Sequence, residues 1–252
     1  MLYRLRRHPV PIQAFFRSSL VLTYAFPADL LKPLLPPGLK IYGLGDLGFL
    51  AIALVQTESL RPTFLPKSLG CDFFLAGIRI FTQFETATGR TLKGLRILRS
   101  YTDREMMITG GNLLTHYGYR LAEVEVKESE RSLHVAMKTP EGEADIEVVA
   151  NLASMPAPLP ERTPFQSAAE ARRFAGPLPF TFDYEPETHS IVVIEGVRQN
   201  WHPQPVQVDV RRLGILAQPP FRKWADPMLA NAFYVSNIPY SWKRGVVHPL
   251  NR

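Results

Sequence analysis

The sequence has little of what several common kinds of functional site require. One cysteine, Cys71, stands among 252 residues, which excludes an internal disulfide and a CxxC pair for zinc or redox chemistry. No two of the six histidines have a metal-ligand spacing such as HxH or HExxH. Phosphate-binding and dinucleotide-binding glycine motifs and the GxSxG nucleophile elbow are also missing. We therefore expect neither a metal nor another cofactor.

Long apolar runs are also lacking. No stretch approaches the roughly 20 apolar residues that a membrane-spanning helix needs. The basic start, MLYRLRRH, is followed by Pro9 and Pro11, and Arg17 interrupts the next apolar residues, so the central segment of a signal peptide is missing. We expect a cytoplasmic protein without a membrane partner, which also suits the single cysteine.

The charge is positive but not concentrated. The formal net charge of +6 is spread along the chain, so nucleic-acid binding is the weakest of the alternatives considered. A hydrophobic content of 46% and a charged content of 21% are typical of a globular protein. We expect one domain over residues 1–252.

Strand patterns dominate the sequence. Alternating or β-branched and aromatic residues predict strands at 15–24, 47–55, 77–85, 95–101, 119–127, 131–138, 143–150, 190–198, 205–213 and 231–236. Helices are few and short, near 28–35, 113–117 and 168–174. The predicted class is α+β, with a large antiparallel, barrel-like β-sheet and a few short helices.

The best candidate for a site lies within residues 99–126, where polar, aromatic and basic side chains converge. Thr109-Gly110-Gly111-Asn112 breaks the chain, and Asn112 can cap a turn of helix that Gly118 closes. Free backbone N–H groups at such a helix start can hold an anion. The alternative is that the glycines only turn the chain.

Three segments carry a family resemblance. Leu22-Thr23-Tyr24 followed by ADLLKPLLPPGLKIY, the segment described above, and Trp201-His202-Pro203-Gln204-Pro205 occur in an order that resembles the acetoacetate-decarboxylase-like superfamily. Within it, the chain is most similar to a bacterial branch that lacks the Schiff-base lysine. The resemblance implies the fold and a pocket more than it implies an activity.

The named enzyme of that superfamily uses a lysine that forms a Schiff base with a β-keto acid. Desolvation and a neighbouring cation keep its amine unprotonated. The resemblance places the family's proline and its two lysines on Gly118, Tyr119 and Arg120, and no lysine occurs between Lys93 and Lys127. We therefore expect no Schiff-base decarboxylation and expect the pocket to persist.

The resemblance also places an arginine at Arg17, seven residues before Tyr24. Its guanidinium could bind a carboxylate with two hydrogen bonds, or it could be exposed or paired with an acidic residue. Tyr119 could donate a hydrogen bond to a ligand carbonyl, or it could belong to the core. His116 could act as an acid or base, or it could simply pack.

Other strand arginines, Arg79, Arg96, Arg99 and Arg120, are further candidates, of which one or two at best are expected inside. The leading hypothesis is a small-molecule binding protein or a cofactor-independent acid–base enzyme or lyase acting on an oxo acid or similar anion. Its predicted residues are Tyr119 and His116 for catalysis and Arg17, Asn112, Arg79 and Arg120 for substrate binding.

The main alternative belongs to another class: a non-catalytic assembly module. In it, Phe221, Trp224 and Trp242 would be exposed aromatic residues at subunit contacts. A solid interior without a cavity would favour this alternative. Under either hypothesis we expect a homo-oligomer.

Overall fold

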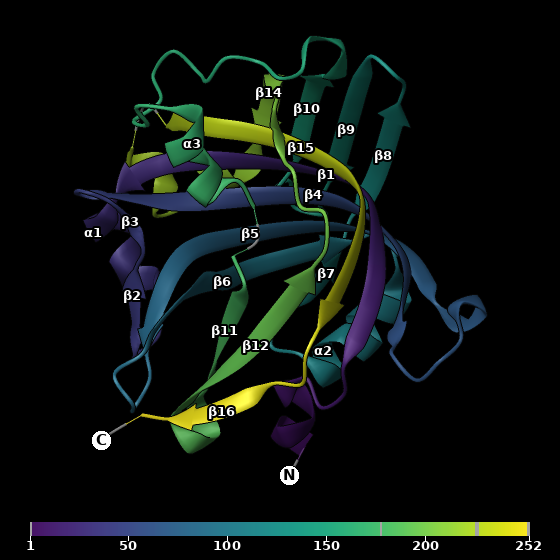
Figure 1. The fold of residues 1–252 in the computed structure, drawn as a ribbon, viewed down its shortest axis with the longest axis vertical. Helices are drawn as coiled ribbons and strands as arrows, with labels where there is room; N and C mark the ends of the chain where they lie inside the picture. The colour runs from purple at the N-terminus through teal and green to yellow at the C-terminus, as the bar shows by residue number, and fades with distance from the viewer. Residues whose placement is uncertain (1, 177, 225–226, 251–252) are drawn as a thin grey trace.

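The computed structural model describes residues 2–176, 178–224 and 227–250 and consists mainly of two sheets (Figure 1). The larger sheet has 12 strands. Its main order is β13 (Gln204–Pro205), β15 (Met228–Trp242), β1 (Ile12–Pro27), β4 (Leu47–Pro62), β5 (Cys71–Glu85), β6 (Thr91–Thr102), β11 (Phe180–Glu185), β12 (Ser190–Arg198) and β16 (Val246–Pro249). Three short strands pair at its side: β2 (Leu39–Ile41), β3 (Gly43–Leu44) and β7 (Tyr119–Leu121).

The smaller sheet has four strands in the order β14 (Gln207–Leu213), β10 (Ile146–Asn151), β9 (Ser132–Lys138) and β8 (Glu123–Glu128). The helices are short: α1 (Ala28–Leu31), η4 (Met107–Gly111), α2 (Asn112–Leu114) and α3 (Ala168–Ala171). The remaining turns are η1 (Leu2–Arg7), η2 (Lys32–Leu34), η3 (Lys67–Leu69), η5 (Leu152–Ser154), η6 (Arg172–Phe174), η7 (Pro186–Thr188), η8 (Gly214–Ala217) and η9 (Phe221–Lys223). None of the described helices is long and apolar enough to span a bilayer.

The large sheet closes into a ring. Gly196–Arg198 of β12 pair with residues 240–242 of β15, so the path through β1, β4, β5, β6 and β11 returns to its start. Two pairings, β6 with β11 and β6 with β7, are parallel, and the others are antiparallel. The predicted class, α+β with a large, mostly antiparallel sheet and few short helices, is confirmed.

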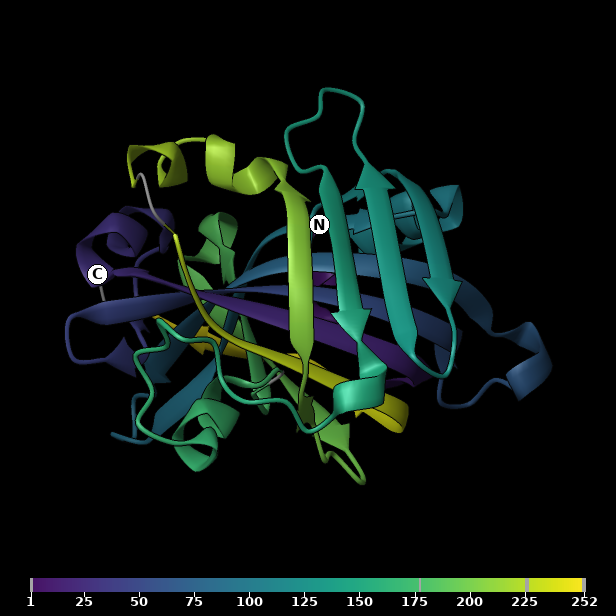
Figure 2. The same ribbon diagram turned by 90° about the horizontal axis from the view of Figure 1, so that it is seen from above.

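Each face of the ring buries its own hydrophobic cluster. In β1, Leu20 and Leu22 face outward to a core shared with the four-stranded sheet, which lies across the large sheet in Figure 2. Val21 and Ala25 face the interior of the ring. Successive residues of a strand point to opposite faces, so both faces of β1 and β4 must be apolar. This explains the nearly continuous apolar run in residues 47–55.

A β-bulge interrupts β1 at Arg17. Phe16 pairs with Thr57 and Ser18 with Gln56, which leaves Arg17 as an extra residue opposite β4. Such a residue leaves the ladder and bends the strand. The bulge directs Arg17 outward while Phe16 belongs to the inner cluster.

The sequence placed most strands correctly but not all their boundaries. The helix expected at 113–117 is instead a helical segment over 105–114 that ends at Leu114. The single strand expected at 119–127 is divided at Ala122 into β7 and β8, which belong to different sheets. Strands β11 and β16 were not predicted.

Candidate functional site

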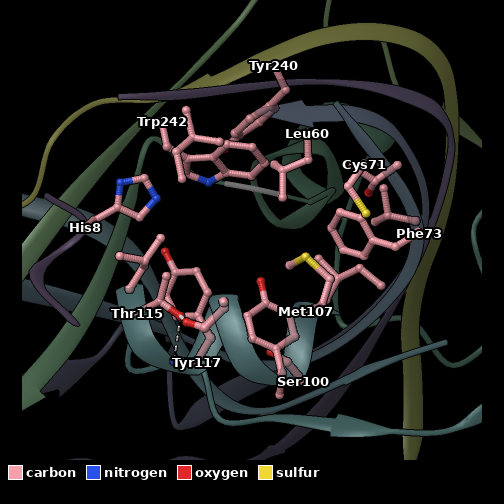
Figure 3. A pocket seen from close by; sticks show the side chains of 18 of the residues that line it. His8, Leu60, Cys71, Phe73, Ser100, Met107, Thr115, Tyr117, Tyr240 and Trp242 are labelled. Atoms are coloured by element: carbon pink, nitrogen blue, oxygen red, sulfur yellow. Dashed lines mark hydrogen bonds between the residues drawn. The ribbon is translucent and has the colours of Figure 1, made fainter. Parts of the chain in front are cut away.

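The interior of the ring contains a cavity of about 350 Å³. Strands β1, β4, β5, β6 and β15 form most of its wall, and the segments 8–12 and 106–119 complete it (Figure 3). Most lining side chains are apolar, and among the described residues no aspartate, glutamate or lysine lines the cavity. The same part of the chain contains no group of three or more His, Cys, Asp or Glu side chains arranged to hold a metal ion.

Two arginines line the cavity, Arg61 and Arg79, and Arg79 has no acidic partner among the described residues. It lies in the middle of β5, paired with Ala51 and Ile97 of the neighbouring strands, and its side chain lines the cavity. Its Nε is buried and has no hydrogen-bond partner among the described residues. Burial lowers the pKa of Arg79. The rest of the guanidinium borders the cavity, so the cation is enclosed by protein and has no acidic partner in the part of the chain that the structure describes. Because an enclosed cation is poorly hydrated, an anion in the cavity would be favoured.

Three tyrosines surround this guanidinium. Burial raises the pKa of Tyr117, Tyr119 and Tyr240, so all three phenols are neutral at physiological pH. For Tyr119 and Tyr240, the charge of Arg79 opposes this shift. The hydroxyl of Tyr117 is buried without a partner. The site therefore offers neutral O–H donors beside a cation, which is an arrangement suited to an oxyanion.

Two glycines make room for these side chains. A Cβ added at Gly77 would lie 2.6 Å from Nε of Arg79, and one at Gly111 would lie 2.6 Å from Cδ2 of Tyr119. Neither position can therefore carry a larger residue without moving its neighbour. Asn112 holds the backbone of Tyr119 in place, because its side chain accepts a hydrogen bond from the Tyr119 N–H (2.7 Å) and donates one to the Tyr119 carbonyl (3.0 Å).

His8 contributes an imidazole to the same cavity. Its backbone has a positive φ of 54° and is held at both ends, since its N–H donates to Leu114 and its carbonyl accepts from Gly245. The ring points into the open space (Figure 3). Burial lowers the pKa of His8 to about 4, opposed by hydrogen bonding to the backbone of Lys243 and Val10. At neutral pH the ring is uncharged and can accept a proton.

The structure brings together only some of the residues that the sequence singled out. Arg79 and Tyr119 both line the cavity. Asn112 does not line it but positions Tyr119 through the two hydrogen bonds described above. It lies inside the helical segment rather than capping its start.

Three other candidates lie outside the cavity, which corrects the expectation that they line it. Arg17 is exposed at the bulge, with its side chain 60% accessible and its Nε 3.9 Å from Glu128. Arg120 follows Tyr119 in β7 and therefore points the other way, 3.9 Å from Glu143. His116 lies between two residues that line the cavity, Thr115 and Tyr117, and turns away from it.

Several lining residues were not foreseen. Tyr117 and Tyr119 lie on either side of Gly118, whose positive φ of 61° turns the chain, and their ring centroids are 6.2 Å apart. Tyr240 stands at the same spacing from Trp242, which also lines the cavity. Phe221 is also not exposed, because it packs on Phe26 in the core with ring centroids 5.3 Å apart.

Solved structures share this fold. Acetoacetate decarboxylase from Legionella pneumophila subsp. pneumophila aligns with a TM-score of 0.61 and 13% identity over 95% of this chain and 87% of that chain. An acetoacetate decarboxylase-like enzyme from Sphingomonas wittichii RW1 aligns with a TM-score of 0.57 and 12% identity over 98% of this chain and 94% of that chain. The enduracididine biosynthesis enzyme MppR, complexed with pyruvate, aligns with a TM-score of 0.57 and 12% identity over 95% of this chain and 90% of that chain. The chain thus has the fold of the acetoacetate decarboxylase-like proteins.

A family model places the chain more closely. Residues 13–247 match the DUF2071 family, described as an uncharacterized conserved protein, and the chain belongs to that family. No curated protein matches the sequence.

Proposed function

We propose that this protein binds a small organic acid in the cavity inside the ring and that Arg79 holds the acid group. The observation that carries the proposal is the buried Nε of Arg79, which lacks a partner among the described residues. MppR, a protein of the same fold, is complexed with pyruvate, so an oxo acid is a reasonable first ligand to test.

The energetics support an anionic ligand. Leaving one charge buried and unpaired costs several kcal/mol, on the order of 3–5 kcal/mol in proteins whose buried pairs are broken. A carboxylate would restore two charge-assisted hydrogen bonds to the planar guanidinium. No acidic side chain among the described lining residues competes for Arg79.

If the protein is an enzyme, its chemistry is acid–base catalysis on the bound acid. The charge of the bound acid would offset the burial that lowers the pKa of His8 to about 4, so that His8 can accept a proton. Tyr119 donates a hydrogen bond to the oxygen on which negative charge develops. His8 takes the part that the sequence suggested for His116. A Schiff base is not part of the proposal, because no lysine occurs among the described lining residues.

The test compares Arg79→Met with Arg17→Met. Calorimetric titration with pyruvate and acetoacetate should show binding to the wild type and a loss of roughly 10- to 100-fold in affinity for Arg79→Met, since charged hydrogen bonds contribute about 1.5–3 kcal/mol. Arg17→Met is the matched control, because Arg17 is exposed at the bulge, and it should bind as the wild type does. Equal affinities for the wild type and Arg79→Met would overturn the proposal.

The covalent alternative has its own test. Borohydride reduction in the presence of acetoacetate should leave the mass of the protein unchanged. A stable adduct on any lysine would contradict the proposed non-covalent binding.

A further inference from the structure

We propose that the acid bound at Arg79 carries an apolar body, alkyl or aryl, which fills the rest of the cavity as far as a mouth between Leu69 and Met106. This inference rests on the proposed function and adds the class of ligand to it. The cavity would thus serve an amphiphilic carboxylic acid rather than a small, wholly polar oxo acid.

The volume of the cavity is the first argument. At roughly 30 Å³ for each water-sized group, its 350 Å³ holds about 12 such groups. Pyruvate, with about six non-hydrogen atoms, would occupy only about half of that space. The unfilled half would have to keep water against apolar walls, which is unfavourable.

The chemistry of the walls is the second argument. Large apolar side chains make up much of the wall, including those of Phe16, Val55, Leu60, Phe73 and Leu75. The sulfur-bearing side chains of Cys71 and Met107 add soft, polarisable surface beside them. A second charged group on the ligand would lose its hydration against these side chains without gaining a partner from them.

The mouth is the third argument. Leu69 on η3 and Met106 at the start of the helical segment both line the cavity, yet they are 64% and 60% exposed. The apolar interior therefore continues to the surface between them. Arg61 also lines the cavity, but its guanidinium donates to the carbonyls of Ser59 (2.8 Å) and Leu65 (3.2 Å). Arg79 thus remains the deep, uncommitted cation, which places the acid group inside and the apolar body toward the mouth.

A chain-length series tests the inference. Linear saturated carboxylates from acetate to decanoate are titrated calorimetrically, each beside the primary alcohol of the same length. Affinity for the acids should rise by about fourfold for each added methylene until the cavity is full. Each alcohol should bind at least tenfold more weakly than its acid, because it carries no charge for Arg79.

Cys71 supplies an independent readout. It is the only cysteine of the chain and is a half-buried residue of the cavity wall, so the rate of its reaction with a thiol reagent reports on one known position beside this space. Octanoate should slow the labelling of Cys71, and acetate at the same fractional saturation should slow it less.

The variant Met106→Glu tests the orientation of the ligand. A carboxylate at the mouth should weaken octanoate binding by about tenfold or more and weaken acetate binding less, since only the longer chain reaches Met106. Leu113→Glu is the matched control, because Leu113 is exposed on the same helical segment but does not line the cavity. Both sites are exposed, so both variants should fold.

The outcomes separate the two proposals. Affinity that depends on Arg79 but not on chain length would overturn the amphiphile and leave the organic-acid site standing. Affinity that grows with chain length but is equal for acids and alcohols would overturn the role of Arg79. Equal octanoate affinity for Met106→Glu and Leu113→Glu would overturn the placement of the apolar body at the mouth.

Discussion

At the scale of single residues, the arginines of this chain differ in what faces them. Arg96 donates to Asp183 at 3.0 Å, and Nε of Arg7 donates to Glu185 at 2.8 Å. Both carboxylates are fully buried, so each of these cations neutralises an interior charge. Arg79 is enclosed in the same molecule without such a partner. Among the described residues, Arg7 and Arg96 thus each have a buried acidic partner, and Arg79 at the cavity has none.

His8 should make the free energy of unfolding depend on pH. Burial lowers its pKa to about 4, whereas an ordinary histidine has a pKa near 6.5. Between these two values the unfolded chain binds a proton that the folded chain does not, so stability falls as the pH falls. Lowering the pH from 7.5 to 5 should cost the wild type about 2 kcal/mol through His8.

Urea denaturation of the wild type and His8→Gln at pH 7.5 and pH 5 measures this contribution. The free-energy difference between the two proteins should change by about 2 kcal/mol in favour of the variant at the lower pH. His202→Gln, at an exposed histidine, should follow the wild type at both values. If the free energy of unfolding of His8→Gln changed with pH as much as that of the wild type, His8 would not be held neutral by burial.

At the scale of elements, the helical segment and β7 act as one unit that presents Tyr119. The segment ends at Leu114, and Asn112 reaches across to both backbone polar groups of Tyr119. Gly111 lies against the Tyr119 ring, where a Cβ has no room. The sequence suggested that Gly110 and Gly111 form a turn or an anion site. In the structure, Gly111 instead leaves room for the ring of Tyr119, and Gly110 does not contact that ring.

Gly110 and Gly111 form a matched pair for mutation. Gly110→Ala meets no atom within 4 Å and should leave stability unchanged or raise it by up to about 1 kcal/mol, because alanine favours a helix. Gly111→Ala should destabilise the fold by about 1–3 kcal/mol through overpacking and should weaken acid binding by displacing Tyr119. Thermal unfolding and titration with octanoate check both. Indistinguishable variants would refute the close fit between Gly111 and Tyr119.

The elements also show how far the sequence can be read. The strand cores were predictable, because alternation and apolar content are local properties. The bulge at Arg17 was not, since it depends on how β1 pairs with β4, whose residues lie about 40 positions away. Family position placed Arg17 at the site, and one extra residue in the ladder turned it outward. Arg79 lies two residues after Gly77 in a strand, and a glycine in a strand often marks a place where another group packs closely against the backbone. That pattern alone left Arg79 as one of several candidate arginines for the cavity.

At the scale of the whole molecule, the cavity exists because the ring closes. Closure joins Gly196 to Trp242 and Arg198 to Tyr240. The Tyr240 ring also packs on Phe16 of the adjacent strand β1, with centroids 4.7 Å apart. His8, Arg79, Tyr119 and Tyr240 come from four distant parts of the chain and meet only after this step. Local sequence patterns do not show which distant residues come together in the closed ring, so the sequence indicated a pocket only through family resemblance.

The closure can be tested at Gly196. A Cβ there would collide with the hydroxyl of Tyr240. Gly196→Ala should therefore lower the free energy of unfolding by about 1–3 kcal/mol and weaken acid binding. Adding Tyr240→Phe removes the oxygen but leaves Cζ of the ring 2.9 Å from the added Cβ, so it should restore only part of the lost stability, which a double-mutant cycle in urea measures. Strictly additive effects would show that the two residues do not meet.

The attachment of His8 to Leu114 and Gly245 has a practical consequence. His8 is part of the cavity wall, so the segment that carries it is not a dispensable tail. A shortened version starting at Pro9 would lack the imidazole and both backbone attachments. Trimming at this terminus would therefore change the proposed binding cavity even where the remaining strands still assemble.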